Sequence, residues 1–254
     1  MMKQTFLFGI LLLFFYTGPF AHAHSLWLNI DDDQPKVEQA VRVEIGWGHK
    51  FPKDEVIKEG FLDQVYAVDS KGVKISLKQV SATEFEFVPQ APGAYTILAN
   101  GRPGFLSKTP EGFKLQSKTG LEDVVSCFRY DIRAKAIVYA GDVVKAPDQA
   151  FGDILEIILL GDPNELGKGE TLPVKVLYKG KPLASVEVKA TYAGFSDEPY
   201  IFALTTKTDA EGLARIKILQ KGDWFVNVVH ETPYPHPEEC DSYKNNYSFT
   251  FKVK

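Results

Sequence analysis

Histidine is the residue type whose placement in this sequence points most directly to chemistry. The stretch FAHAHSLWLNI holds two of the five histidines, and one of them, His24, directly follows a short apolar leader. Removal of the leader after Ala23 would make His24 the first residue and give it a free amine. An α-amino group has a pKa of about 8, so a metal ion displaces its proton more easily than that of a lysine. The amine and the imidazole Nδ1 of this one residue can then close a chelate ring on one ion.

The leader itself has the features of an export signal. Lys3 gives it a positive start, and residues 5–20 are apolar but too short and too poorly flanked to span a bilayer. The sequence AHA at residues 21–23 places small residues at the positions expected before a cleavage site. We therefore expect residues 1–23 to be a signal peptide and the product to be periplasmic or secreted.

Two more histidines stand where a strand is expected to end, in GWGHKFP (His49) and in GDWFVNVVH (His230). A side chain at a strand end is oriented by the sheet and still reachable from solvent. With the amine and imidazole of His24, these rings would form a nitrogen-rich site suited to nickel, cobalt, copper or zinc. Taken singly, each histidine is more often a rim or turn residue than a metal ligand. His236, in the Pro-rich TPYPHPEEC, could serve as an auxiliary ligand.

The elements that must position these histidines are short alternating strands separated by turn residues. Segments such as QAVRVEIGW and LPVKVLYKGKPLASVEVKATYAG alternate apolar and polar residues, which is typical of antiparallel sheets packed as sandwiches. The pattern loosens near residues 141–152. We expect an all-β protein of two β-sandwich domains, at residues 24–145 and 150–254, with the second an immunoglobulin-like sandwich of seven strands.

One segment has helical spacing instead of alternation. Its apolar residues recur at steps of three and four, after a Thr and a Glu spaced as in a capping box. The pattern predicts one short helix in the N-terminal half, with these residues: Thr119, Leu121, Glu122, Val124, Val125, Phe128 and Ile132.

Charge and cysteine content restrict the partners and the compartment. The formal net charge is −4 and no basic stretch is interleaved with aromatic residues, so nucleic acid and anionic lipid are poor partners. Any association with a membrane is expected to be peripheral. The two cysteines, Cys127 and Cys240, favour a disulfide in an exported chain, with two buried thiols as the alternative.

Several motifs together resemble a bacterial periplasmic family of unknown function that is associated with nickel and cobalt uptake. They are HSLWL, GHKFP, FRYDIRAKAIV, GDPNELGKGETLPVKVLYKGKPLASVEV, TDAEGLARIKIL and GDWFVNVVH, and they extend over almost the whole chain after the leader. The resemblance implies a two-part β protein with metal ligands at His24, His49 and His230. The sequence departs from the family in a shortened middle around residues 109–120 and in its Pro-rich segment after His230.

These observations favour a periplasmic metal-binding protein, not an enzyme, that captures a divalent ion and presents it to a membrane importer. Nickel or cobalt is favoured by the resemblance, and copper by its place at the top of the divalent affinity series. Two alternatives stay open. One is a secreted copper-dependent oxidative enzyme with a histidine-brace-type site. The other is a structural or adhesive β module in which the histidines are incidental.

Overall fold

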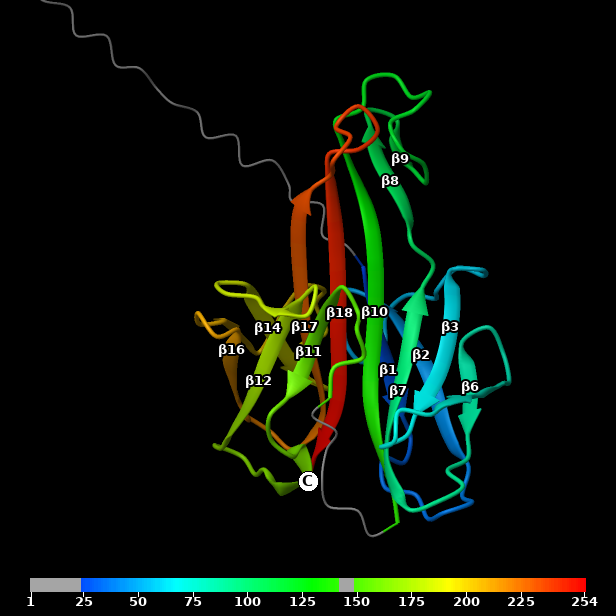
Figure 1. The fold of residues 1–254 in the computed structure, drawn as a ribbon, viewed down its shortest axis with the longest axis vertical. Helices are drawn as coiled ribbons and strands as arrows, with labels where there is room; N and C mark the ends of the chain where they lie inside the picture. The colour runs from blue at the N-terminus through cyan, green and yellow to red at the C-terminus, as the bar shows by residue number, and fades with distance from the viewer. Residues whose placement is uncertain (1–23, 142–148) are drawn as a thin grey trace, which may run out of the picture.

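The computed structural model describes residues 24–141 and 149–254, which form a molecule built of strands (Figure 1). The expected signal peptide, residues 1–23, lies outside the described residues, as does most of the expected domain boundary. Within the described ranges the one helical element is the short 3-10 helix η1 (Pro163–Glu165). None of their helices has the length and apolarity needed to cross a membrane. The expected all-β class is confirmed.

A ten-stranded sheet runs through the whole molecule and takes strands from both halves of the chain. Its central pair, β10 and β18, is parallel, and its other pairs are antiparallel. In spatial order the main path is β15 (Leu204–Lys207), β14 (Glu187–Tyr192), β17 (Gly222–Pro233), β18 (Ser242–Val253), β10 (Ser126–Ala140), β7 (Gly93–Gly101), β3 (Leu62–Val68) and β4 (Lys74–Ser76). The strands β8 (Gly104–Thr109) and β9 (Gly112–Lys114) extend it beside β10.

Two smaller sheets cover the ten-stranded sheet. The first has the order β1 (Ser25–Ile30), β2 (Val41–Gly48), β6 (Glu84–Phe87) and β5 (Lys78–Gln79). The second joins β11 (Leu155–Leu159), β12 (Thr171–Tyr178) and β13 (Lys181–Pro182), with β16 (Leu213–Lys217) also paired to β12. We call them the N-terminal and the C-terminal small sheet.

The two small sheets lie on opposite faces of the ten-stranded sheet, and β10 shows why. Successive side chains of a strand point to opposite faces. The even-numbered residues of β10 from Ile132 to Ala140 belong to the core under the N-terminal small sheet. Ile137 and Tyr139 belong instead to the core under the C-terminal small sheet. One strand therefore supplies both cores, each on its own side.

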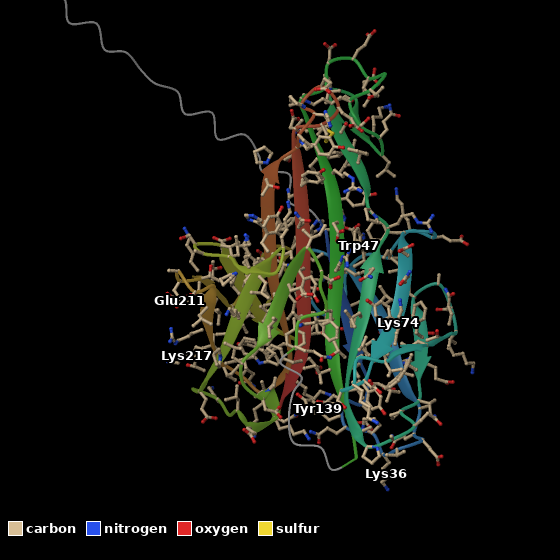
Figure 2. The ribbon with its side chains drawn as sticks, in the orientation of Figure 1. Lys36, Trp47, Lys74, Tyr139, Glu211 and Lys217 are labelled. Atoms are coloured by element: carbon tan, nitrogen blue, oxygen red, sulfur yellow. A yellow bond between two sulfur atoms is a disulfide. The ribbon has the colours of Figure 1, made fainter. Side chains whose placement is uncertain are left out.

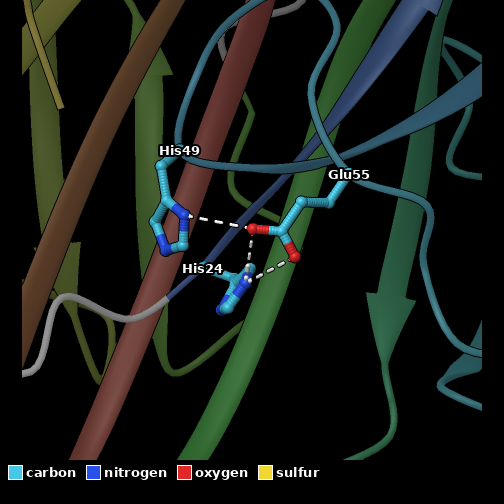
Figure 3. Close-up of side chains that lie close together, drawn as sticks. All are labelled: His24, His49 and Glu55. Carbon is cyan, nitrogen blue, oxygen red and sulfur yellow. Dashed lines mark hydrogen bonds and ion pairs between the residues drawn. The ribbon is translucent and has the colours of Figure 1, made fainter. Parts of the chain in front are cut away.

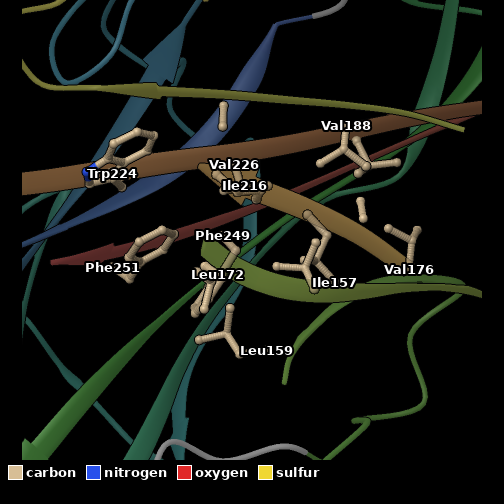
Figure 4. Packing of buried hydrophobic residues seen from close by; sticks show 14 of the residues in the cluster. Ile157, Leu159, Leu172, Val176, Val188, Ile216, Trp224, Val226, Phe249 and Phe251 are labelled. Atoms are coloured by element: carbon tan, nitrogen blue, oxygen red, sulfur yellow. The ribbon is translucent and has the colours of Figure 1, made fainter. Parts of the chain in front are cut away.

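The C-terminal core is the larger of these two clusters. Aromatic residues of β17 and β18, such as Trp224 and Phe249, pack against aliphatic residues of the small sheet, such as Leu172 and Ile157 (Figure 4). All four of these side chains are fully buried. The result is the expected immunoglobulin-like sandwich of two facing sheets. The division into domains at 24–145 and 150–254 stays a prediction, and the ten-stranded sheet is continuous across it.

The expected short helix is wrong. Residues 115–125 form turns and bends, and β10 begins at Ser126, so Phe128 and Ile132 lie in a strand. Asp123 adopts a positive φ of 51°, which interrupts any helix there. The backbone of β10 is paired with β7, β8 and β18, and the hydrogen bonds of these ladders outweigh the local helical spacing.

Beyond the two sandwiches, the far ends of β10, β17 and β18 continue with β8 and β9 as a projecting arm (Figure 1). Cys127 and Cys240 form a disulfide there, as expected, across 113 residues of sequence. Lys118 also pairs with Asp241 in this arm. Charged side chains cover the flanks of the body, with Glu211 and Lys217 on one side and Lys74 on the other (Figure 2).

Candidate metal centre

His24 and His49 meet because of the register between β1 and β2. The two strands are antiparallel and pair Ser25 with Gly48, Leu26 with Trp47 and so on along the ladder. One step beyond Ser25 and Gly48, the same register places His24 opposite His49. Directly opposed residues have Cβ atoms about 4.5–5.5 Å apart, so the two rings are neighbours. Their centroids are 4.0 Å apart.

The position of β1 is fixed by side chains of β18. Because β1 is the edge of its sheet, one row of its carbonyls has no partner strand. Asn246 donates to the carbonyl of His24 at 2.9 Å, and Thr250 donates to that of Leu28 at 2.7 Å. Between them, Ser248 donates to the carbonyl of Leu26. This ladder of polar side chains anchors the start of β1, and therefore His24, on the ten-stranded sheet.

The loop after β2 brings a carboxylate to the two histidines. Gly48 has a φ of +130°, and a Cβ there would lie 2.4 Å from an oxygen of Asp54. Asp54 accepts hydrogen bonds from the backbone N–H of His49 at 2.7 Å and of Lys50 at 3.1 Å, which closes the loop. The N–H of Glu55 then donates to the carbonyl of Trp47 at 3.0 Å. Only glycine fits at position 48, because it tolerates this φ and leaves room for the carboxylate of Asp54.

The middle of the same loop is held by one carbonyl. The oxygen of Pro52 accepts from the indole of Trp27 at 2.9 Å and from the amide of Asn29 at 3.0 Å. Trp27 can reach it because the opposite residue is Gly46, where a Cβ would overlap the indole. The two glycines of GWGHKFP therefore have separate steric roles: Gly46 leaves room for the indole of Trp27, and Gly48 for the carboxylate of Asp54.

His24, His49 and Glu55 form one cluster of ligand-type atoms (Figure 3). Nε2 of His24 lies 3.2 and 3.1 Å from the two carboxylate oxygens of Glu55, and Nδ1 of His49 lies 3.5 Å from one of them. One donor atom from each residue falls within 4.8 Å of the others. The His49 side chain is mostly buried, with 12% exposed, whereas that of Glu55 is 52% exposed. The cluster is therefore packed against the protein on the side of His49 and open to solvent on the side of Glu55.

Aromatic rings surround the pair of histidines. Trp47 stacks on the ring of His24, with centroids 5.0 Å apart and planes 7° from parallel. Tyr200, from the C-terminal half, lies 4.3 Å from the ring of His49, and its backbone N–H donates to the carbonyl of His49 at 3.0 Å. Burial, with the carboxylates of Glu55 and Asp54, raises the pKa of the Tyr200 phenol. These contacts restrict the orientation of both imidazoles.

His230 is not part of this cluster. By the two-residue period of a strand, it shares a face of β17 with Trp224, Val226 and Val228. This face of β17, however, is the one that packs under the C-terminal small sheet, where His230 contacts Tyr178 edge-on with centroids 4.6 Å apart. The other face of β17 carries Phe225 and turns toward β1. Desolvation lowers the pKa of His230, as expected beside a core. The expected grouping of three histidines is replaced by two histidines and Glu55.

His236 also lies apart from the cluster. It stands in the turn that precedes Cys240, and its Nδ1 lies 3.6 Å from Glu238 on the exposed surface of the arm. The structure does not place it as an auxiliary ligand to His24 and His49.

The donor set determines which ions the cluster could hold. Two imidazole nitrogens and one carboxylate oxygen suit first-row transition metals better than calcium or magnesium, which prefer oxygen ligands alone. In the arrangement seen, His24 presents Nε2 to Glu55. A chelate with the amine of the same residue would use Nδ1, because only that nitrogen is covalently near enough. The chelate would therefore use the other ring nitrogen from the one that faces Glu55 in this structure.

Glu55 is the cluster member that sequence reasoning missed. It lies in a loop without periodicity, and carboxylates there are usually solvated. The usable signal is the spacing GHKFPKDE, in which a glycine, a proline and an aspartate can close a loop on the preceding strand.

A family model for a domain of unknown function, DUF4198, matches residues 21–232. The chain belongs to this family. The match includes the start of β1, the loop with His49 and Glu55, and His230 near its end. The comparison with curated proteins found no match.

The solved structures with similar folds are distant. The D0-D1 domain of intimin is 15% identical with a TM-score of 0.24, over 91% of this chain and 100% of that one. A segment of two fibronectin type III domains from chicken tenascin is 14% identical with a TM-score of 0.22, over 89% and 97%. The fibronectin(III)-like modules of Clostridium thermocellum CbhA are 12% identical with a TM-score of 0.21, over 89% and 94%. Similarities this weak have no bearing on function.

Proposed function

We propose that this protein, after removal of residues 1–23, is a periplasmic metal-binding protein that holds a divalent transition metal and supports its uptake. The ligands are the amine and imidazole of His24, the imidazole of His49 and the carboxylate of Glu55. The observation that carries the proposal is the convergence of these three side chains within 4.8 Å on a strand edge anchored by β18.

The choice of ion follows from the donors. Three nitrogens and one oxygen fit nickel, cobalt and copper, and copper binds such sets most tightly. Nickel or cobalt remains the proposed cargo because of the family resemblance. Delivery to a membrane importer is the role proposed for the loaded form, because the cluster is partly exposed and an ion held there can leave.

The test compares two forms of the protein in calorimetric titrations with nickel, cobalt and copper. One form begins at His24, and the other carries one extra alanine before it. The extra residue converts the amine into an amide, so we expect the affinity to fall at least about tenfold, as for other perturbed metal sites. His49→Ala should weaken binding in both forms, whereas His236→Ala should not.

Thermal unfolding separates this proposal from a purely structural role. A ligand that binds only the folded state adds about 2.7 kcal/mol at a hundredfold excess over its Kd. The processed form should therefore melt at a higher temperature with metal. Equal affinity in the extended form would contradict the amine chelate. The absence of stoichiometric metal and of any melting shift would favour the structural module instead.

A further inference from the structure

A groove of about 550 Å³ begins at the candidate metal centre and runs along the ten-stranded sheet. It exists because β1, the edge of the N-terminal small sheet, lies over β18 and leaves the same face of β14 and β17 uncovered. His49 lines one end of this groove, and Lys244 on β18 and Glu231 on β17 line it too. A site of this size matches those that hold small organic molecules, which occupy about 300–1,000 Å³.

The floor of the groove next to the metal centre is aromatic. Trp27, Phe51 and Phe225 line it and pack on one another, with centroid separations between 5.5 and 6.1 Å. These rings are buried, and the floor is therefore preformed. Such a surface suits the carbon skeleton of a ligand.

The rest of the groove wall carries both signs of charge in equal number. Lys189 lies 3.0 Å from Glu187 on β14. Burial lowers the pKa of Lys244, and the carboxylate of Glu231 acts in the opposite direction. The charged residues lining it are Lys50, Lys189 and Lys244 with Glu187, Glu198 and Glu231. Three lysines and three glutamates in one groove offer partners to a carboxylate and to an ammonium group at once.

Tyr200 links the groove to the metal centre. It lines the groove, contacts His49, and adopts a φ of +64°, which is unusual for a residue with a large side chain. Backbone strain of this kind is common where a loop is held for binding. The loop from the C-terminal half thus forms a wall shared by the groove and the ion.

From these features we infer that the protein takes its metal as a complex with a zwitterionic organic chelator, of the amino acid or short peptide class. The inference rests on the proposed function. The described donors of His24, His49 and Glu55 leave coordination positions for an external ligand, and an ion by itself would leave most of the groove empty. The chelator would bind the ion through its amine and carboxylate and place its remaining groups against the groove.

The experiment is equilibrium dialysis of the processed protein against radiolabelled L-histidine, with and without nickel, while the nickel retained is measured in parallel. We expect one histidine retained per bound nickel, and none without nickel. Citrate, which has no ammonium group, should be retained at least tenfold less. Val229→Trp fills the groove from its exposed position on β17, and Val80→Trp is the matched control at an exposed valine that does not line it.

The nickel affinity of Val229→Trp should stay within twofold of that of the unaltered protein, and its retention of histidine should fall at least tenfold. Val80→Trp should change neither quantity. If Val229→Trp also loses nickel, Lys189→Glu tests whether the groove holds the histidine, because it reverses one groove charge without adding bulk. This variant should weaken histidine retention tenfold. Undiminished histidine retention in the groove variants, retention without nickel, or equal retention of citrate would overturn the inference and leave the metal site intact. Failure of the unaltered protein to bind nickel would overturn the proposed function as well.

Discussion

At the scale of single residues, the candidate metal centre depends on a carboxylate that replaces an expected imidazole. Glu55 lies within hydrogen-bond distance of His24 and within ion-pair distance of His49. The pair of Glu55 with His24 is partly exposed, with 36% of the His24 side chain and 52% of the Glu55 side chain accessible to solvent. Pairs of this kind are worth at most about 1 kcal/mol, so the arrangement contributes little to folding. In the proposed site, the role of Glu55 is to supply a carboxylate oxygen as a metal ligand.

Replacement of the Glu55 carboxylate should lower the metal affinity while leaving the free energy of unfolding almost unchanged. Glu55→Gln keeps the size of the side chain and removes the charge, so we expect metal affinity to fall at least about tenfold. The free energy of unfolding without metal should change by less than about 1 kcal/mol. Titration calorimetry and urea unfolding measure the two quantities. Glu59→Gln, at an exposed glutamate outside the cluster, is the control, and equal effects of both changes would remove Glu55 from the ligand set.

At the scale of elements, the site is the meeting point of a strand edge and a closed loop. β1 delivers His24 because polar side chains of β18 satisfy the carbonyls that its open edge leaves free. The loop after β2 delivers His49 and Glu55 because Asp54 accepts two of its backbone N–H groups. Neither element makes the site alone.

The loop can be tested at its first glycine. Gly48→Ala places a methyl group against Asp54 at a φ of +130°, so we expect a loss of about 1–3 kcal/mol in stability. His49 and Glu55 should separate, and metal affinity should fall. Gly60→Ala is the matched control, since Gly60 also has a positive φ of +78° but nothing lies within 4 Å of the added Cβ. Thermal unfolding and metal titration of both variants make the comparison, and similar results for the two would show that the contact with Asp54 is unimportant.

At the scale of the whole molecule, the two halves are joined through β10 and β18. β10 carries side chains into both cores, whereas β18 supplies the C-terminal core on one face and holds β1 with polar side chains on the other. The disulfide fixes the start of β10 next to the start of β18. A loop of 113 residues is closed by that bond. Closing so long a loop restricts the unfolded chain strongly.

Loss of the disulfide should therefore destabilise the protein without affecting the site. For the double variant Cys127→Ser with Cys240→Ser we expect a loss of about 2–5 kcal/mol. Metal affinity should stay within about twofold, because the bond lies in the arm and His24 is held further along β18, at Asn246. Urea unfolding and metal titration check these two expectations. Treatment of the unaltered protein with a reductant should reproduce the change in stability, and a variant as stable as the oxidised protein would contradict the argument.

A buried lysine gives the molecule a pH dependence at alkaline pH. Lys135 on β10 is 4% exposed, and desolvation lowers its pKa from 10.5 to about 8, with Glu156 and Asp153 acting in the opposite direction. Between these two pH values the unfolded chain holds a proton that the folded protein lacks. The free energy of unfolding should therefore rise from pH 8 toward pH 10, by at most about 1.4 kcal/mol per pH unit.

Lys135→Met should remove most of that rise, because methionine has no proton to lose; the smaller share of Lys244, whose pKa burial also lowers, should stay. Lys221→Met, at an exposed lysine, should keep it. Urea unfolding at three pH values between 7.5 and 9.5 makes the comparison. A variant of Lys135 whose stability still increases with pH as in the unaltered protein would show that this residue is not the source.

The sequence by itself determined the local features of this protein. Alternation in QAVRVEIGW and LPVKVLYKGKPLASVEVKATYAG predicted strands, and the number and expected compartment of Cys127 and Cys240 favoured the disulfide that the structure shows. It also singled out His24 and His49. Alternation identifies which residues share a face, as in β17 for His230, Val226 and Val228, because the period of a strand is a local property.

Only the tertiary structure decided which face points where. The C-terminal small sheet covers the His230 face of β17, and β1 approaches the other one, so His230 is separated from His24 by the sheet itself. In the same way, pairing with neighbouring strands turned the helical spacing before Ile132 into a turn and a strand. Glu55 joined the site through a loop closure that no periodicity announces. Each of these outcomes depends on contacts between segments far apart in the chain. The free energy of such contacts cannot be inferred from the sequence of one segment.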